Sequence, residues 1–194
     1  MKKLISTVAI ALIAVASFAQ NWKLDAAHSK IKFSTKYLVI SDVDGEFKKF
    51  DGQFASSKAD WTDLTAMVTA DVNSITTDND MRDKHLKSDD FFNAEKFPVI
   101  TFKSKSVKNL GGNKFILVGD LTIRDVTKEV QVPVYFGGIV KDPWGNTKAG
   151  FKATGKINRK EFNLKYNNAA AAGEAVVGDN VEFTIDLVLI KQPS

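Results

Sequence analysis

The sequence predicts an all-β domain of about eight antiparallel strands. Apolar and polar residues alternate with a period of two along most of the chain, which is typical of strands with one buried and one solvated face. Short turn signals such as Asp44-Gly45, Gly111-Gly112-Asn113 and Gly178-Asp179-Asn180 separate these runs. Connections this short join antiparallel neighbours, so the strands form one sheet system.

The first predicted strand covers residues 29–37, where Ile31 and Phe33 alternate with Lys30 and Lys32. The same alternation predicts further strands at residues 45–54, 64–73, 100–106, 115–121, 129–136, 151–157 and 181–187.

Helical periodicity is confined to residues 78–93, where Met81, His85 and Leu86 can share one face of a short helix. Residues 169–173 are low in complexity and predict a loop or a single helical turn.

The chain of 194 residues predicts a signal peptide followed by one domain. Lys2 and Lys3 precede an apolar run, and Ser17-Phe18-Ala19 fits the small residues that a signal peptidase accepts. We therefore expect cleavage after Ala19, which leaves a mature domain over residues 20–194. This mature protein is expected to be periplasmic or secreted. An uncleaved membrane anchor is the alternative, although the apolar run is shorter than the roughly 20 residues of a membrane-spanning helix.

Composition excludes several classes of protein. The absence of cysteine excludes disulfides, thiol nucleophiles and thiolate metal sites. The net charge of +4 falls to +2 once Lys2 and Lys3 are removed, which gives no indication of a nucleic-acid partner. With two histidines in the chain, no metal site is expected, and Asp78-Asn79-Asp80 fails as a calcium loop because Asp83 stands where glycine is required.

Alternation alone leaves the architecture open between a sandwich and a closed barrel. The inward positions combine large phenylalanine rings with the small residues Gly45, Gly119, Ala153 and Gly155. We interpret this mixture as favouring gaps, and therefore a cavity, over uniform packing. An eight-stranded barrel is about the size that either fills with side chains or holds one small apolar ligand.

Several motifs, in order and spacing, resemble the YceI-like family of polyisoprenoid-binding, lipocalin-like proteins. They are Trp22-Lys-Leu-Asp25, His28-Ser29-x-Ile31-x-Phe33, Arg82-Asp83-x-His85-Leu86, Phe97-Pro98-x-Ile100-x-Phe102, Arg124-x-Val126-Thr127 and Asn158-Arg159-x-x-Phe162. The resemblance implies an extended eight-stranded lipocalin-like barrel with a helical insertion near residues 80–92. It also implies a long isoprenoid or similar lipid inside the barrel, and it makes a homodimer plausible.

The predicted barrel lining consists of inward-facing apolar residues. They are Phe33, Phe47, Val68, Phe102, Leu121, Val134, Phe136, Phe151, Ile157, Phe183 and Ile185. Periodicity shows only that these residues face inward, so a close-packed core without ligand is the alternative.

Six polar residues within the motifs are expected to have structural or head-group roles. They are His28, Arg82, Asp83, His85, Arg124 and Arg159. The three arginines are the only ones in a chain that otherwise uses lysine, which indicates a need for a planar, two-pronged donor. We favour ion pairs to aspartates over contacts with a lipid head group.

The predicted function is non-enzymatic binding, storage or transport of a long-chain isoprenoid or similar lipid, without any other cofactor. The rival is a small lipid-modifying hydrolase or isomerase that uses His28 or His85 as a general base. His28 and Ser29 are a poor catalytic dyad, because neighbours on a strand point to opposite faces.

Overall fold

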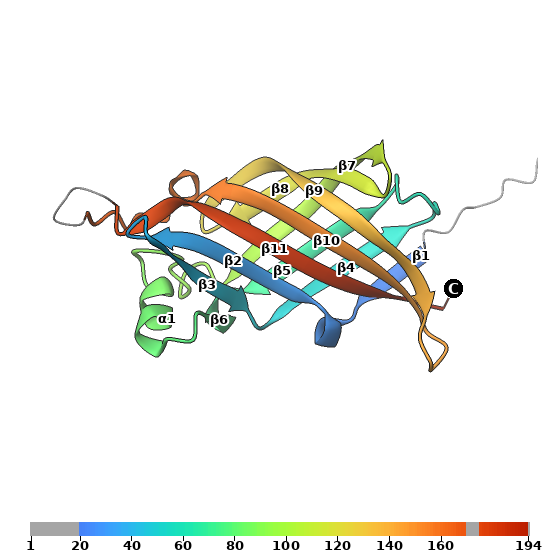
Figure 1. The fold of residues 1–194 in the computed structure, drawn as a ribbon, viewed down its shortest axis with the longest axis horizontal. Helices are drawn as coiled ribbons and strands as arrows, with labels where there is room; N and C mark the ends of the chain where they lie inside the picture. Colours follow the sequence, from blue (N-terminus) through green and yellow to red (C-terminus); the bar gives the residue numbers. More distant parts are fainter. Residues whose placement is uncertain (1–19, 170–174, 194) are drawn as a thin grey trace, which may run out of the picture.

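The computed structural model describes residues 20–169 and 175–193, which form a closed antiparallel β-barrel (Figure 1). The predicted signal peptide, residues 1–19, lies outside the described residues, as does the predicted loop beyond Ala169. Five barrel strands are continuous. They are β7 (Val99–Gly111), β8 (Lys114–Ile123), β9 (Val126–Lys141), β10 (Thr147–Asn158) and β11 (Val177–Lys191).

The other three barrel strands are each divided into two segments. The short 3₁₀ helix η1 (Ala26–His28) separates β1 (Gln20–Leu24) from β2 (Lys30–Tyr37), and η2 (Val72–Ser74) separates β5 (Thr65–Asp71) from β6 (Ile75–Thr76). The single strand predicted at residues 45–54 is likewise two, β3 (Ser41–Phe47) and β4 (Phe50–Ser56).

The last strand closes the barrel by pairing with both segments of the first. Lys191 of β11 lies opposite Trp22 of β1, and Ile185 lies opposite Ile31 of β2. Closure leaves eight strand positions around the barrel, so the sandwich alternative is excluded. The predicted all-β, eight-stranded barrel with one short helix is confirmed.

The helical insertion α1 (Asp80–Leu86) is shorter than predicted. Asn79 begins the helix by accepting a hydrogen bond from the Arg82 backbone N–H at 3.0 Å. After Leu86 the backbone turns instead, and the Asn93 N–H donates to the Ser88 carbonyl at 2.8 Å. Met81, expected to share one face of this helix with His85 and Leu86, is 82% exposed.

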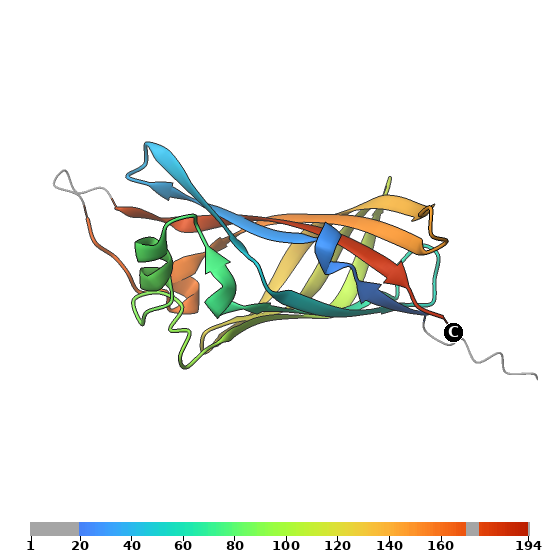
Figure 2. The same cartoon turned by 90° about the horizontal axis from the view of Figure 1, so that it is seen from below.

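The two ends of the barrel differ (Figures 1 and 2). One end carries α1, the β2–β3 hairpin and the 3₁₀ helix η3 (Arg159–Phe162) that follows β10. The opposite end carries the β9–β10 hairpin and the C-terminus. None of the helices formed by the described residues has the length and apolar character needed to span a membrane.

Candidate functional site

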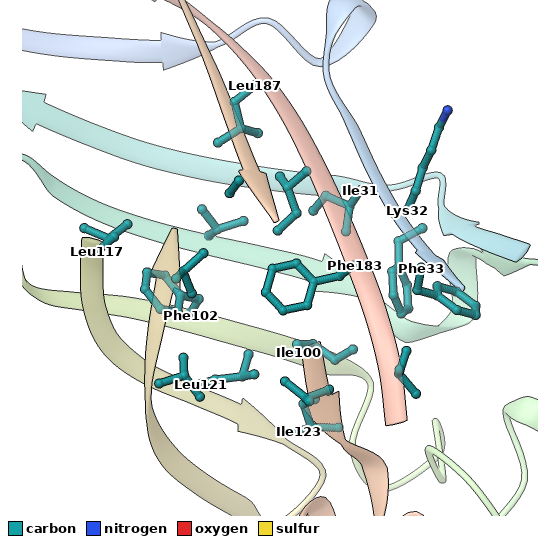
Figure 3. A pocket seen from close by; sticks show the side chains of 18 of the residues that line it. Ile31, Lys32, Phe33, Ile100, Phe102, Leu117, Leu121, Ile123, Phe183 and Leu187 are labelled. Atoms are coloured by element: carbon teal, nitrogen blue, oxygen red, sulfur yellow. The ribbon is translucent and has the colours of Figure 1, made fainter. Parts of the chain in front are cut away.

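The interior of the barrel is an apolar cavity with about 240 Å³ of space for the centres of water-sized molecules. A single water needs only about 10–15 Å³ by this measure, so the core is not close-packed. Figure 3 shows Ile100 and Phe102 of β7, Leu121 of β8 and Phe183 of β11 pointing into one common space. Of the predicted lining residues, the wall contains Phe33, Phe47, Val68, Phe102, Leu121, Val134, Phe151, Ile157, Phe183 and Ile185.

Phenylalanine rings lie along this wall over glycines. A Cβ added at Gly45 would come within 2.3 Å of the Phe33 ring, and one at Gly119 within 2.6 Å of the Phe102 ring. The sequence suggested that the glycines leave empty gaps, but the rings occupy the space over them. The glycines make room for rings to lie flat, and the flat rings keep the cavity open.

The end of the barrel opposite α1 is closed by an aromatic cluster formed by Trp22, Trp61, Phe136 and Phe151. The Trp61 ring lies 4.9 Å from those of Trp22 and Phe151 and 5.7 Å from that of Phe136, measured between centroids. Phe136, which the sequence placed on the cavity wall, instead packs in this closed-end cluster. Phe136 lies far along β9, close to the end of the barrel. Alternation predicts which face of a strand a residue is on, but not how far along the barrel axis it lies.

Trp61 was not among the predicted site residues. It lies in the β4–β5 loop, outside the alternating runs, and its indole Nε1 is buried without a hydrogen-bond partner among the described residues. The Asp63 carboxylate holds this loop by accepting hydrogen bonds from the Ser56 hydroxyl at 2.6 Å and the Ser57 N–H at 2.8 Å. The sequence offered one signal for this residue, which is a large aromatic side chain in a segment of loop-forming Asp and Thr residues.

A second cavity, the mouth pocket, lies at the α1 end and offers about 200 Å³ by the same measure. It shares the lining residues Phe33, Thr35, Leu86, Phe91 and Val177 with the barrel cavity, so the two adjoin. The mouth pocket is more polar than the barrel cavity. Its remaining lining residues are Lys36, Tyr37, Val43, Thr77, Arg82, His85, Tyr166 and Val176.

Arg82 and Asp83 both hold Thr77, which precedes α1. The Arg82 guanidinium donates to the Thr77 hydroxyl and carbonyl oxygens, each at 2.7 Å, while Asp83 accepts from the Thr77 N–H at 2.8 Å and hydroxyl at 2.6 Å. Burial alone would raise the pKa of Asp83, but the hydrogen bonds from Thr77 outweigh it and lower that pKa. The partner expected for Arg82 was a carboxylate, and the structure shows a threonine instead.

His85 lies at the mouth with its ring against two aromatic side chains. Its Nε2 is 2.8 Å from Asp90 Oδ2, and its ring contacts those of Phe91 and Tyr166 edge-on, each at 5.1 Å between centroids. Phe91 and Tyr166 stack on each other. Sequence reasoning missed both aromatic residues, because neither belongs to an alternating strand.

Arg124 ties the β8–β9 turn to the segment after α1. Its Nη1 donates to the Asp89 carbonyl at 2.8 Å, and its Nη2 pairs with Asp89 Oδ1 at 2.8 Å. The carboxylate partner matches the predicted ion pair. Arg124 is not part of either cavity wall.

Arg159 is 2% exposed and lies at the edge of the barrel cavity. It donates to the Gly178 and Leu164 carbonyls at 2.9 Å and pairs more loosely with Asp179 at 3.3 Å. Burial lowers the pKa of its guanidinium, although the Asp179 charge opposes this shift. Arg159 thus anchors the ends of β10 and β11 beside the mouth.

His28 is remote from both cavities. It lies on η1, which directly precedes β2, and its Nδ1 is 2.9 Å from Asp25 Oδ2. The neighbouring Ser29 is buried, and its hydroxyl accepts a hydrogen bond from the Val188 N–H at 2.9 Å. Within residues 20–169 and 175–193, no group of three His, Asp or Glu side chains is arranged to hold a metal ion.

A closed antiparallel barrel around an apolar cavity, with a more polar pocket at one end, defines a lipocalin-like β-barrel protein. The chain belongs to the YceI-like family, since residues 22–189 match the YceI-like domain.

Known relatives agree with this assignment. UPF0312 protein SAB2563 of Staphylococcus aureus is 41% identical over 164 residues, which covers 84% of this chain and 93% of the relative. The crystal structure of Burkholderia cenocepacia BcnA superposes with a TM-score of 0.75 at 28% identity, covering 85% of this chain and 98% of that chain. A polyisoprenoid binding domain from Saccharophagus degradans has the same fold, with a TM-score of 0.66 at 16% identity, covering 88% of this chain and 98% of that chain.

Proposed function

We propose that this protein binds a long-chain isoprenoid or similar lipid and stores or carries it outside the cytoplasm, without catalysis. The observation that carries the proposal is the apolar cavity along the barrel, which adjoins a more polar pocket at the α1 end. A lipid has the same division into a long apolar chain and a polar head. The domain from Saccharophagus degradans that shares this fold is a polyisoprenoid binding domain, which supports the same ligand class.

The energetics of such a complex are sufficient without any covalent step. At about −0.3 kcal/mol per heavy atom, a chain of roughly 40 carbons supplies on the order of −12 kcal/mol, which corresponds to nanomolar binding. The head group would lie in the mouth pocket near Tyr37, His85 and Tyr166, whose polar atoms suit a hydroxyl or carbonyl such as that of a quinone precursor.

Mass spectrometry of an organic extract tests this proposal. The protein purified from its native compartment should release about one equivalent of a long-chain lipid. N-terminal sequencing of the same preparation should begin at Gln20, as cleavage after Ala19 requires. Absence of lipid from the extract, together with failure to take up added polyprenol, would leave the barrel a structural or interaction protein.

The rival function is a lipid hydrolase or isomerase, and the close pairing of His85 with Asp90 is the feature that favours it. The His85 imidazole contacts aromatic rings, and among the described residues no serine or threonine hydroxyl is hydrogen-bonded to that imidazole. Incubation with extracted lipid should therefore give no product. Turnover that disappears in His85→Ala would establish the enzyme and overturn the carrier.

A further inference from the structure

The hairpin that joins β2 to β3 exposes apolar side chains beside the mouth pocket. Val39 is 64% exposed and Ile40 is 84% exposed, at the tip of the hairpin. Tyr37, at the end of β2, is also exposed and lines the mouth pocket, so the apolar surface continues into the pocket wall. Met81 of α1 stands out into solvent beside Arg82, another residue of that pocket. Tyr37, Val39, Ile40 and Met81 together form what we call the apolar rim.

The backbone of this tip is strained. Leu38 has a φ of 49° and Val39 a φ of 65°, in the left-handed region that asparagine and glycine adopt easily. A β-branched residue such as valine is a marked outlier there. An Asn-Gly turn would be relaxed and soluble, so aliphatic side chains at this tip point to a role that needs them.

We infer that the apolar rim inserts into the surface of a lipid bilayer, so that the mouth pocket faces the membrane while a lipid enters or leaves the barrel. This inference rests on the proposed lipid-binding function. It explains why the four residues of the apolar rim are exposed beside the polar opening of an apolar cavity. A lipid chain would then pass between the bilayer and the barrel without crossing water. Exposure of the apolar chain to water would be the most costly step of the transfer.

Two further observations favour a membrane over a protein partner. A standard protein interface contains about 20–30 residues on each side, whereas the apolar rim has four. Beside the hairpin tip the charge is balanced, because Lys36 pairs with Asp42 at 2.9 Å. Attachment should therefore depend on apolar insertion, occur on uncharged lipid and respond little to salt.

The opposite end of the barrel provides a matched control. Trp144 in the β9–β10 hairpin is 82% exposed, as prominent as Met81 or Ile40. At that end the rings of Trp22, Trp61 and Phe151 pack on one another, whereas the mouth pocket lies at the α1 end. Insertion that serves lipid exchange must therefore involve Ile40 and not Trp144.

Site-specific fluorescence can compare the two ends, since the chain has no cysteine. Ile40→Cys and Trp144→Cys, made in the chain from Gln20 onward, are each labelled with an environment-sensitive dye and mixed with phosphatidylcholine vesicles. We expect a blue-shifted, several-fold brighter emission from the label at residue 40 and little change at residue 144. No response at residue 40, or equal responses at both sites, would overturn the inference.

Vesicle flotation supplies the second readout. Val39→Asn combined with Ile40→Asn removes the aliphatic tip, and asparagine tolerates the left-handed backbone, so the hairpin should still form. The apparent partition constant should fall by at least about tenfold, whereas Trp144→Asn should leave it unchanged. Equal flotation of the double variant and the parent would overturn the inference, as would a dimer in sedimentation that the double variant dissociates.

The extract experiment separates this inference from the proposed function. Lipid in the extract combined with flotation that does not depend on residues 39 and 40 removes the docking surface and leaves the carrier. Absence of lipid combined with rim-dependent flotation removes the carrier and leaves membrane attachment.

Discussion

The phenyl ring of Phe183 lies over Gly155, directly opposite it on the neighbouring strand, so closely that a Cβ at Gly155 would come within 2.3 Å of the ring's Cζ. Phe33 and Gly45 repeat this arrangement between β2 and β3, again with a separation of 2.3 Å. A ring that lies against the wall occupies little of the interior. The width of the cavity therefore depends on the absence of a side chain at these glycines.

Gly155→Ala should reduce lipid content more than stability. The added methyl group must push the Phe183 ring into the cavity, and the ring can swing there because the interior is open. We expect bound lipid to fall at least about twofold, with a change in unfolding free energy within about 1–2 kcal/mol. Mass spectrometry and chemical denaturation of the same samples measure both quantities.

Gly150→Ala is the control for this prediction, since a Cβ at Gly150 meets nothing within 4 Å in the same strand. Equal loss of lipid in both alanine variants would show that the position of the Phe183 ring does not set the capacity of the cavity.

Arg82→Lys should destabilise the protein by about 1–2 kcal/mol while leaving bound lipid largely intact, because a lysine cannot make both hydrogen bonds to Thr77. A double-mutant cycle with Thr77→Val checks the pairing, since two residues that act through one contact give less than additive losses. Unchanged stability with reduced lipid would instead assign Arg82 to the head group.

Trp61→Ala should open the closed end and lower the unfolding free energy by about 3–5 kcal/mol, as expected for a buried aromatic residue. Trp61→Phe should cost distinctly less, because the indole N–H has no partner among the described residues to lose. Denaturant titration ranks the two variants. If Trp61→Phe is as damaging as Trp61→Ala, the indole N–H has a partner that the static structure does not show.

Asp63→Asn should lower the unfolding free energy at pH 7, and it should make the unfolding free energy depend less on pH in the acidic range. Burial alone would raise the pKa of Asp63, but hydrogen bonds from Ser56, Ser57 and Lys58 hold it well below its usual range. A carboxylate whose pKa is lower in the folded state than in the unfolded state stabilises the fold at any pH above its unfolded-state pKa, which is near 4. This stabilisation is lost as the pH falls toward the folded-state pKa.

Denaturation at pH 7 and pH 3 measures this effect. The parent should lose more stability between the two values than Asp63→Asn does. Asp44→Asn, an exposed position in β3, serves as the control. A parent and an Asp63→Asn variant with the same pH dependence would show that this carboxylate does not hold the loop.

The sequence by itself determined the strands and the side of the barrel that each residue faces. Alternation is a local property, so Phe33, Phe102 and Phe183 could be placed inside without knowledge of their neighbours. The short helix and the family also followed from the order of motifs. Breaks such as that between β3 and β4 leave the alternation nearly intact, and they were missed.

Only the tertiary structure decided what depends on residues far apart in the chain. Closure requires β11 to pair with β1 and β2, and the end of the cavity requires Trp61 to meet Phe151. Phe136 faces inward, as alternation indicates, yet it helps to close one end because strand tilt and register set its height. Arg82 contacts Thr77, five residues before it in the chain, instead of a carboxylate, and here the local turn ahead of α1 decides the partner. Side-chain partners follow from three-dimensional proximity, which a period of two does not contain.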